Sequence, residues 1–486
     1  MRKSIHTWRV YLLLVLCSLL GVSMGGTLVY AEDSASSYNY SFWGDTVAAP
    51  SAYEATELLD GNKLGVGPFK EPNDLHVTEE QMIYVADSGN NRIVVLDSSL
   101  KPVTVVDSFE RDGQKETFNN PQGLFVTDQK QLIVADTGNK RVVKLDQNYK
   151  LLSIIEAPKS DLLAGNFDFQ PVRVIADKAQ RIYVMSTGVF DGFMEFSQEG
   201  EFTSFIGANK VKVDPTELLW KKLSTKAQRS QMIMFTPTEF TNLDIDGEGF
   251  IYATNGDKWG DSIKKLNAQG NDILRRTGYF NPQGDVRYIG AQGPSRLVDI
   301  DVADSEMYSV LDSVRGRIFT YNGDGHLMYV FGGIGNQMGQ FKTAAAIERM
   351  GDRFLVLDKA FGEMTVFDTT QYGRTLNEAV RSYYKGDEEK AFELYNEAVN
   401  MNANLEFAYS GIGKSLLRKG DYKGAMQYFE ESYDRANYSK SFLLYRKQVL
   451  REHFAAIMTV IIVLAAVTLV GRRVRKRRKG GVAIES

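Results

Sequence analysis

One segment of this chain occurs twice, and that repeat limits the possible folds more than any other feature of the sequence. The segment IYVADSGNNRIVVLD at residues 83–97 returns as LIVADTGNKRVVKLD at residues 132–146, 49 residues later. A period of this size marks a supersecondary unit that is copied because one copy cannot bury its own surface. Each unit contains three short runs of β-branched and aromatic residues separated by Gly, Asn and Asp, which predicts consecutive antiparallel strands.

Four weaker copies extend the repeat to six units. The units begin, in chain order, at Pro72, Pro121, Pro171, Pro237, Pro294 and Ala344, where alanine replaces the proline. Six such units predict a radial array in which each sheet packs against the next and closure leaves few free edges. We therefore expect an all-β six-bladed propeller over residues 38–370. The segment SAYEATELLDG at residues 51–61 is expected to supply the outer strand of the sixth blade and so close the ring.

The repeated segment resembles a known family. VADSGNNRIVVLD and VADTGNKRVVKLD are similar to NHL repeats, strongly in the first two units and weakly in the other four. This resemblance implies a six-bladed propeller that usually serves as a binding platform. Asp87 and Asp136 lie at predicted strand ends, with Arg92 and Arg141 five residues later. We interpret both pairs as structural, with turn capping and a carboxylate–guanidinium contact inside each blade.

A second repeat follows the propeller and predicts an all-α module over residues 372–452. Its period is 34 residues, and the equivalent pairs are Gly386 and Gly420, Ala391 and Ala425, and Tyr395 and Phe429. Helix pairs of this period resemble tetratricopeptide repeats, although the usual tryptophan and closing proline of that family are missing. Two units are fewer than the roughly three that normally stack stably. The segment at residues 439–454 continues without Gly or Pro into an apolar run, so we expect one continuous helix that makes the helical module a stalk between the propeller and the membrane.

The two ends of the chain predict its location. Residues 1–31 have a basic start, an apolar run and a small-residue exit, which is typical of a signal peptide. Residues 454–470 contain no charged side chain and predict one transmembrane helix. The basic tail at residues 471–486 is expected on the cytoplasmic side, because Lys and Arg favour that side. We therefore expect a single-pass protein of a bacterial cell membrane with its N-terminal domains extracellular.

Charge and cysteine content exclude several function classes. The two ends contribute charges of +3 and +6 to a total of −4, so residues 32–470 carry −13. Such an acidic body argues against a nucleic-acid partner, because phosphate binding needs a basic face. The only cysteine, Cys17, lies in the predicted signal peptide. The rest of the chain therefore has no disulfide and no thiolate for catalysis or metal binding.

Enzymes exist on this fold, and their chemistry requires particular residues in the propeller. Only His76 and His326 lie in it, so the three-imidazole metal site of the NHL-type amidating lyases cannot form. No nucleophile–base pair and no cofactor motif is present at the expected spacings. We therefore predict no catalytic residue, no metal site and no cofactor. The alternative is a calcium-assisted lactonase of the gluconolactonase-like type, which would need several oxygen ligands converging on the propeller axis.

Candidate ligand-binding residues follow from the repeat. The position two residues after each unit start should begin the innermost strand and face the central channel. Around the ring this position is occupied by Asp74, Gly123, Arg173, Glu239, Arg296 and, by alignment, Ala346. Two guanidinium groups at a channel mouth favour a carboxylate, a phosphate or a cluster of sugar hydroxyls. The alternative is that the four charges are solvated or paired with one another.

Two tryptophans add to the candidate site. Trp220 lies in an insertion at residues 211–235, which is predicted to form a short amphipathic helix over one face of the ring. Trp259 lies in the long loop of the fourth unit, and it is the better candidate for an exposed contact with a sugar or a partner. The sequence thus predicts a membrane-anchored extracellular binding or scaffold protein. Its propeller would present a face to a protein or carbohydrate, and its helical module would contact another membrane or envelope protein, such as a transport complex.

Overall fold

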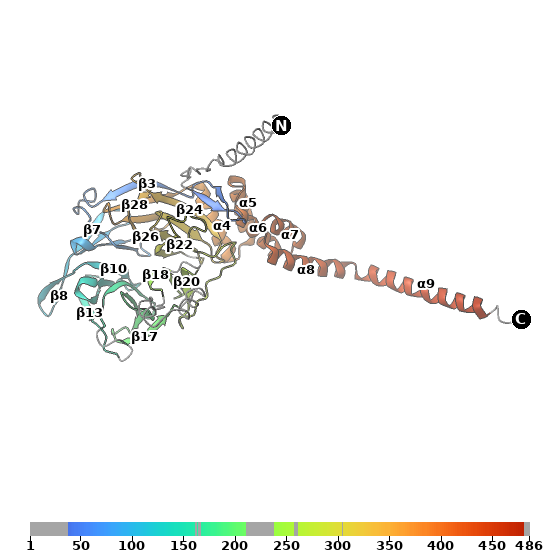
Figure 1. The fold of residues 1–486 in the computed structure, drawn as a ribbon, viewed down its shortest axis with the longest axis horizontal. Helices are drawn as coiled ribbons and strands as arrows, with labels where there is room; N and C mark the ends of the chain where they lie inside the picture. The colour runs from blue at the N-terminus through green and yellow to red at the C-terminus, as the bar shows by residue number, and fades with distance from the viewer. Residues whose placement is uncertain are drawn as a thin grey trace, which may run out of the picture. The chain divides into compact units, whose positions relative to one another are not determined.

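The structure is a computed structural model that describes residues 37–160, 163, 167–209, 238–256, 261–303 and 305–480. The described strands form eight sheets, of which six are the blades of a six-bladed β-propeller and two are separate hairpins (Figure 1). The innermost strand of each blade contacts the innermost strand of the next, from β4 through β10, β14, β18, β21 and β26 and back to β4. These contacts close the ring and confirm the predicted propeller.

Four antiparallel strands make up each of the first three blades. Blade one contains β4 (Asp74–Val77), β5 (Ile83–Asp87), β6 (Arg92–Leu96) and β7 (Pro102–Val106). Blade two contains β10 (Pro121–Val126), β11 (Leu132–Asp136), β12 (Arg141–Leu145) and β13 (Leu151–Ile155). Blade three contains β14 (Pro171–Ala176), β15 (Ile182–Ser186), β16 (Gly192–Phe196) and β17 (Phe202–Gly207).

The last three blades are less regular. In its described part, blade four contains β18 (Phe240–Ile245), β19 (Ile251–Asn255) and β20 (Ile263–Leu266). Blade five contains β21 (Leu297–Val302), β22 (Tyr308–Asp312), β23 (Arg317–Tyr321), β24 (Leu327–Ile334) and the short β25 (Gln340–Phe341). Blade six contains β26 (Ala344–Met350), β27 (Arg353–Asp358), β28 (Glu363–Thr369) and β3 (Tyr53–Asp60).

The pairing of β28 with β3 confirms the predicted closure. The two strands run antiparallel, from Glu363 opposite Asp60 to Thr369 opposite Tyr53. An N-terminal segment thereby supplies the outer strand of the last blade. Two further hairpins were not predicted. They are β1 (Tyr38–Tyr40) with β2 (Thr46–Ala48), and β8 (Ser108–Arg111) with β9 (Gln114–Thr117), which lies between blades one and two.

The packing of β5 explains why the repeated segment is apolar at almost every position. Ile83 and Val85 pack in the core that blade one shares with blade six, whereas Tyr84 and Ala86 pack in the core shared with blade two. Successive side chains of a strand point to opposite faces. Because both faces of the blade are covered, every residue of β5 is buried. The core is therefore divided among the interfaces between blades.

The polar residues of the repeat hold each blade to the segment that leads into it. Asp87 is fully buried, and its carboxylate accepts hydrogen bonds from the Arg92 Nε at 2.7 Å and the Lys70 amide at 2.7 Å. In blade two the Arg141 Nε lies 2.8 Å from Asp136 in the same arrangement. These contacts confirm the structural interpretation of both Asp–Arg pairs.

Six helices follow the propeller. They are α4 (Gln371–Lys385), α5 (Glu388–Met401), α6 (Glu406–Lys419), α7 (Tyr422–Glu431), α8 (Arg435–Glu452) and α9 (Phe454–Gly480). The side chains of Asp387, Asp421 and Asp434 cap the N-termini of α5, α7 and α8. Gly386 and Gly420 end α4 and α6 with φ of 80° and 85°, a conformation that favours glycine. The helix ends thus follow the 34-residue period, whereas the tetratricopeptide character itself stays a prediction.

Helices α4 and α6 share one apolar core with blades five and six. This cluster includes Tyr53 and Tyr329 from the sheets, Leu376 from α4 and Ile412 from α6. The predicted stalk is therefore packed against the propeller at its N-terminal end. The predicted continuous helix is interrupted at His453, whose ψ of 8° lies outside the helical range, between α8 and the apolar α9.

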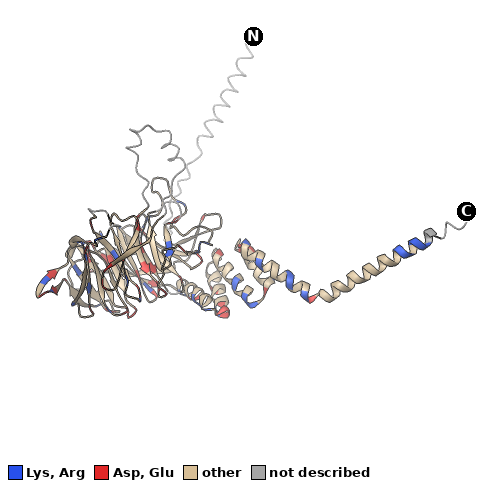
Figure 2. Cartoon of the chain, turned by 90° about the horizontal axis from the view of Figure 1, so that it is seen from below, with Lys and Arg blue, Asp and Glu red and all other residues tan. Residues whose placement is uncertain are grey.

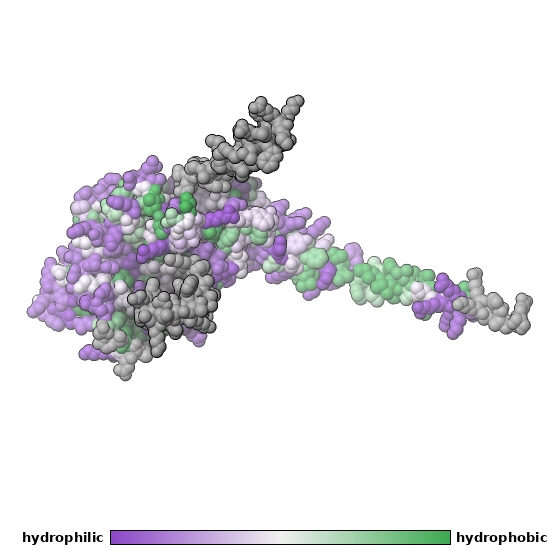
Figure 3. All heavy atoms as spheres, viewed as in Figure 1, coloured by the Kyte–Doolittle hydropathy of each residue, from purple (hydrophilic) through white to green (hydrophobic). Residues whose placement is uncertain are grey.

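One helix in the described part of the chain is long and apolar enough to cross a membrane. It spans Phe454–Arg477, and its mean hydropathy reaches 2.7. In Figure 2 the ribbon of α9 is blue, the colour of Lys and Arg, near its C-terminal end, and Figure 3 shows the green apolar surface that precedes these residues. The predicted signal peptide at residues 1–31 lies outside the described residues.

Candidate functional site

The central channel is lined by the innermost strands, and strand pairing defines which residues occupy equivalent positions. In each blade, one residue of the innermost strand pairs with the last but one residue of the second strand. These six residues form the first ring: Asp74, Gly123, Arg173, Asn242, Asp299 and Ala346. Four of the six are the residues expected from the sequence. Gly123 fits because a Cβ there would lie 2.6 Å from the Val172 carbonyl oxygen of blade three.

The prediction was wrong for blades four and five by three residues in each case. Asn242 and Asp299 occupy the positions that were expected for Glu239 and Arg296. Phe240 and Leu297, rather than the prolines three residues earlier, begin the inner strands in these blades. Glu239 and Arg296 are exposed residues that precede the strands.

Arg296 has a structural contact of its own, since its amide donates a hydrogen bond to Asp312 at 2.9 Å. Trp220 and Trp259, which were also proposed for the site, lie outside the described residues. The structure therefore brings together only Asp74 and Arg173 among the charged or aromatic candidates.

A second ring, two residues further along each inner strand, was missed by sequence reasoning. It consists of His76, Phe125, Ile175, Asp244, Asp301 and Glu348. The sequence could have predicted this second ring, because alternate residues of a strand share a face. Continuing the count by two would have found these residues once the register of blades four and five was known.

The five carboxylates of the two rings hold neighbouring blades together. Each accepts a hydrogen bond from a main-chain amide of the next inner strand: Asp74 from Leu124 (2.9 Å), Asp244 from Val302 (2.8 Å), Asp299 from Ile347 (2.6 Å), Asp301 from Arg349 (2.9 Å) and Glu348 from Val77 (3.3 Å). Inner strands of adjacent blades do not pair in one sheet, so their inward amides need other acceptors. The carboxylates supply them.

Burial among like charges perturbs the carboxyl groups. Burial raises the pKa of Asp244, Asp299 and Glu348 well above the ordinary value, and neighbouring carboxylates raise it further. Burial lowers the pKa of His76, whose Nδ1 lies 3.6 Å from Glu348. The channel therefore favours protonated carboxyl groups and a neutral imidazole.

Arg173 is also held by the protein itself. Its Nη1 donates to the carbonyl oxygens of Gln122 at 2.6 Å and Val172 at 2.9 Å, and its Nε lies 3.9 Å from Asp74. The sequence analysis left open that the charged residues of the ring pair with one another, and Arg173 and Asp74 are such a pair. The guanidinium of Arg173 thus makes most of its contacts with the channel wall.

The described polar residues of the channel use their oxygen atoms for hydrogen bonds within the wall. The amide oxygen of Asn242 accepts a hydrogen bond from Leu243, and its nitrogen donates to Asp299. Asp244 and Asp299 each use both carboxylate oxygens for hydrogen bonds within the wall. Among the residues that the structure describes, no group of three or more His, Cys, Asp or Glu is placed to hold a metal ion.

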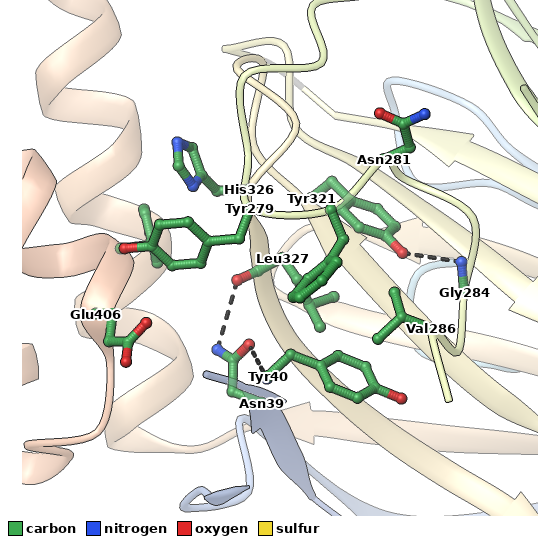
Figure 4. A pocket seen from close by; sticks show the side chains of 12 residues that line it. Asn39, Tyr40, Tyr279, Asn281, Gly284, Val286, Tyr321, His326, Leu327 and Glu406 are labelled. Carbon is green, nitrogen blue, oxygen red and sulfur yellow. Dashed lines mark hydrogen bonds between the residues drawn. The ribbon is translucent and has the colours of Figure 1, made fainter. Parts of the chain in front are cut away.

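A hollow outside the channel lies where β1, blade five and α6 meet (Figure 4). Asn39, Tyr279, Tyr321, His326 and Glu406 are among the residues that line it. Its volume is about 30 Å³, which is room for two or three water molecules, since about 10–15 Å³ on this measure holds one. Burial lowers the pKa of His326 to about 4, so this imidazole is neutral at physiological pH. The hollow is a junction between the propeller and the helices rather than a site for a larger ligand.

Comparison with known proteins supports the repeat. Residues 118–145 match the NHL repeat model. No curated protein matches the chain. Similar solved structures include a streptogramin B lyase, at 11% identity and a TM-score of 0.42, with 66% of this chain and 100% of that chain covered. A virginiamycin B lyase from Staphylococcus aureus has 9% identity and a TM-score of 0.40, with 65% and 100% covered. A putative gluconolactonase has 13% identity and a TM-score of 0.40, with 66% and 94% covered.

Proposed function

We propose that this chain is a membrane-anchored extracellular binding protein that acts beside another membrane protein. The observation that carries the proposal is an apolar surface on α8, directly before the apolar helix α9. Phe442, Leu443 and Leu450 are 47%, 41% and 50% exposed. Residues seven or eight apart lie on one side of a helix, so these three side chains share a face, which we call the α8 face.

The composition of the α8 face suits a protein partner. Arg446 and Lys447 lie four residues after Phe442 and Leu443, and so on the same face. An exposed apolar surface with a charged rim is typical of an interaction site. The fitting partner is a membrane protein whose segment next to the bilayer combines apolar side chains with carboxylates. We propose that such a partner covers the α8 face.

The orientation follows from the basic residues after the apolar helix. Lys and Arg favour the cytoplasmic side, so the propeller would lie outside. The predicted signal peptide would give the same topology. Because α4 and α6 share a core with blades five and six, a partner bound at α8 would be held at a fixed place relative to the propeller. The propeller would then present its loops, including the one that carries Trp259, to an extracellular protein or carbohydrate.

The test is capture of full-length protein from its own membrane in detergent, with partners identified by mass spectrometry. The test variant is Leu443→Glu combined with Leu450→Glu, which places charge on the α8 face without removing any buried side chain. The matched control is Val103→Glu, because Val103 is a 56% exposed apolar residue of blade one.

A membrane protein captured by the wild type and by Val103→Glu, and lost with the double variant, is the expected result. Deleting the whole helical module would be a poor control, because it would expose the core of blades five and six. Absence of any partner, or a partner that the double variant retains, would contradict the proposal.

A further inference from the structure

A second, larger cavity lies between blades four and five. Its volume is about 200 Å³, and its lining includes Phe250, Tyr252, Lys265, Arg275, Glu306 and Tyr308. The cavity exists because blade four departs from the regular fold. After β20 the chain forms one isolated bridge, Leu266 with Asp272, in place of a fourth strand. The side of blade five that a fourth strand would approach is thereby left open.

Aromatic rings form much of the cavity wall. Phe250 and Tyr252 come from blade four, and Tyr308 begins the second strand of blade five. The ammonium group of Lys265 lies 4.5 Å from the ring centre of Phe250 and 5.1 Å from that of Tyr252. This geometry fixes the cation against the rings, so the wall offers apolar surface and a charged donor side by side.

The polar groups of the cavity carry both signs of charge. Lys265 is only 5% exposed, and its Nζ lies 2.9 Å from Glu306 and 3.6 Å from Asp246. Arg275 pairs with the other oxygen of Glu306. An anion entering the cavity would meet the carboxylate of Glu306, and a cation would meet Lys265 and Arg275. Neither kind of ion is therefore favoured.

The hydroxyl of Tyr308 is an independent sign of a missing ligand group. Tyr308 is fully buried, and its hydroxyl oxygen has no hydrogen-bond partner. Burial raises the pKa of this hydroxyl well above its ordinary value, so the group stays neutral. Buried polar groups are nearly always hydrogen-bonded in native proteins. A ligand that both donates and accepts hydrogen bonds would satisfy this group.

We propose that this cavity binds one neutral sugar ring. A sugar hydroxyl can donate to Glu306 and accept from Lys265, Arg275 or Tyr308, and so matches the mixed charges. The C–H face of the ring can pack against the aromatic wall. On this measure a space of about 10–15 Å³ already holds one water molecule, so the cavity of about 200 Å³ has room for one sugar ring. This site is separate from the channel and from the α8 face, and the inference deepens the extracellular binding role of the proposed function, on which it rests.

The position of the cavity links it to the helices. Arg275, which pairs with Glu306, also contacts Asp324 at 3.1 Å, and Asp324 contacts Lys414 of α6 at 2.7 Å. A sugar that hydrogen-bonds Glu306 or Arg275 would thus bind to the first members of a series of ion pairs that ends at Lys414 in the helical module. Binding should therefore raise the temperature at which the protein unfolds.

The experiment is calorimetric titration of the full-length protein in detergent. The probes are glucose, galactose, mannose and N-acetylglucosamine, with acetate and ethanolamine as charged probes. We expect at least one neutral sugar to bind and both charged probes to fail. Tyr308→Phe should weaken that binding about fivefold to tenfold, the value of one hydrogen bond. Because the lost hydroxyl has no partner, the variant should unfold at the same or a higher temperature.

Two further variants make the result decisive. Glu306→Gln should weaken sugar binding, and its unfolding temperature is measured alongside because Lys265 and Arg275 lose a charged partner and keep Asp246 and Asp324. Tyr183→Phe, a buried tyrosine of blade three, should bind as the wild type does. The inference is overturned if no neutral sugar binds, if a charged probe binds more tightly than every sugar, or if Tyr308→Phe and Glu306→Gln both keep wild-type affinity. Because none of these variants touches α8, partner capture can fail or succeed independently.

Discussion

The replacement Asn377→Leu tests whether the propeller and the helical module form one cooperative body. Asn377 of α4 is 1% exposed and lies between two buried tyrosines of the sheets. Its Oδ1 accepts a hydrogen bond from the Tyr329 hydroxyl at 2.7 Å, and its Nδ2 donates to the Tyr53 hydroxyl at 3.0 Å. Leucine has a similar size and removes both hydrogen bonds.

The expected cost follows from the contacts that are lost. Each hydrogen bond contributes about 0.5–1.5 kcal/mol, and a buried hydroxyl left without its acceptor adds a penalty of about 1–3 kcal/mol. We therefore expect Asn377→Leu to lower the free energy of unfolding by about 2–4 kcal/mol. The matched control is Asn396→Ala in α5, whose amide donates only within its own helix, to the Phe392 carbonyl at 2.7 Å. It should change the free energy by less than about 0.5 kcal/mol.

The assay is denaturant unfolding of the full-length protein, followed by far-ultraviolet circular dichroism and by tryptophan fluorescence. If α4 and blades five and six share one core, both signals should shift to the same lower midpoint. A change below about 0.5 kcal/mol would refute the reasoning, since it would mean that the contacts of Asn377 add no net stability. Two separate transitions, with only the helical signal shifted, would refute the single body.

Two further predictions concern the carboxylates of the propeller. Burial raises the pKa of Glu348 above its ordinary value of 4.5, so its contribution to stability is full below that value and is lost as the pH rises through the raised pKa. Glu348→Gln should flatten this loss at pH values above 4.5, and an unchanged pH profile of the unfolding midpoint would show that Glu348 does not cause the loss. Asp136→Ala should cost about 3–5 kcal/mol, because the Arg141 guanidinium loses its buried partner. A cost below about 1 kcal/mol in the same unfolding assay would show that the Asp–Arg pair does not hold the blade.

Local sequence patterns were enough to predict the propeller. The spacing of apolar runs and turn residues gives the number of blades, and the unpaired segment before Pro72 supplies the closing strand β3. The partnership of Asp87 with Arg92 also followed from their spacing, because both residues belong to one hairpin. The number of blades, the closing strand and the Asp–Arg pairs could be predicted because they depend on residues within one blade or on the count of repeats.

The features that failed depend on contacts between elements. Strand pairing determines which residues of blades four and five belong to the first ring. The position of the proline does not predict this pairing. The sequence therefore pointed to Glu239 and Arg296 instead of Asn242 and Asp299. In the described part of blade four, an isolated bridge stands in place of a fourth strand, and neither it nor the cavity beside Tyr308 left a pattern in the sequence. The docking of α4 onto blades five and six likewise depends on tertiary packing.

The topology of the chain is the most direct test of a membrane-anchored extracellular propeller. Cys17 is the only cysteine, so a Cys17→Ser background allows one introduced cysteine to be labelled at a time. Ser99→Cys places the thiol on an exposed turn of blade one, and Ser486→Cys places it at the basic end. A membrane-impermeant maleimide should label Ser99→Cys in intact cells, and Ser486→Cys only after permeabilisation. The reverse pattern, or equal protection of both sites, would contradict the account.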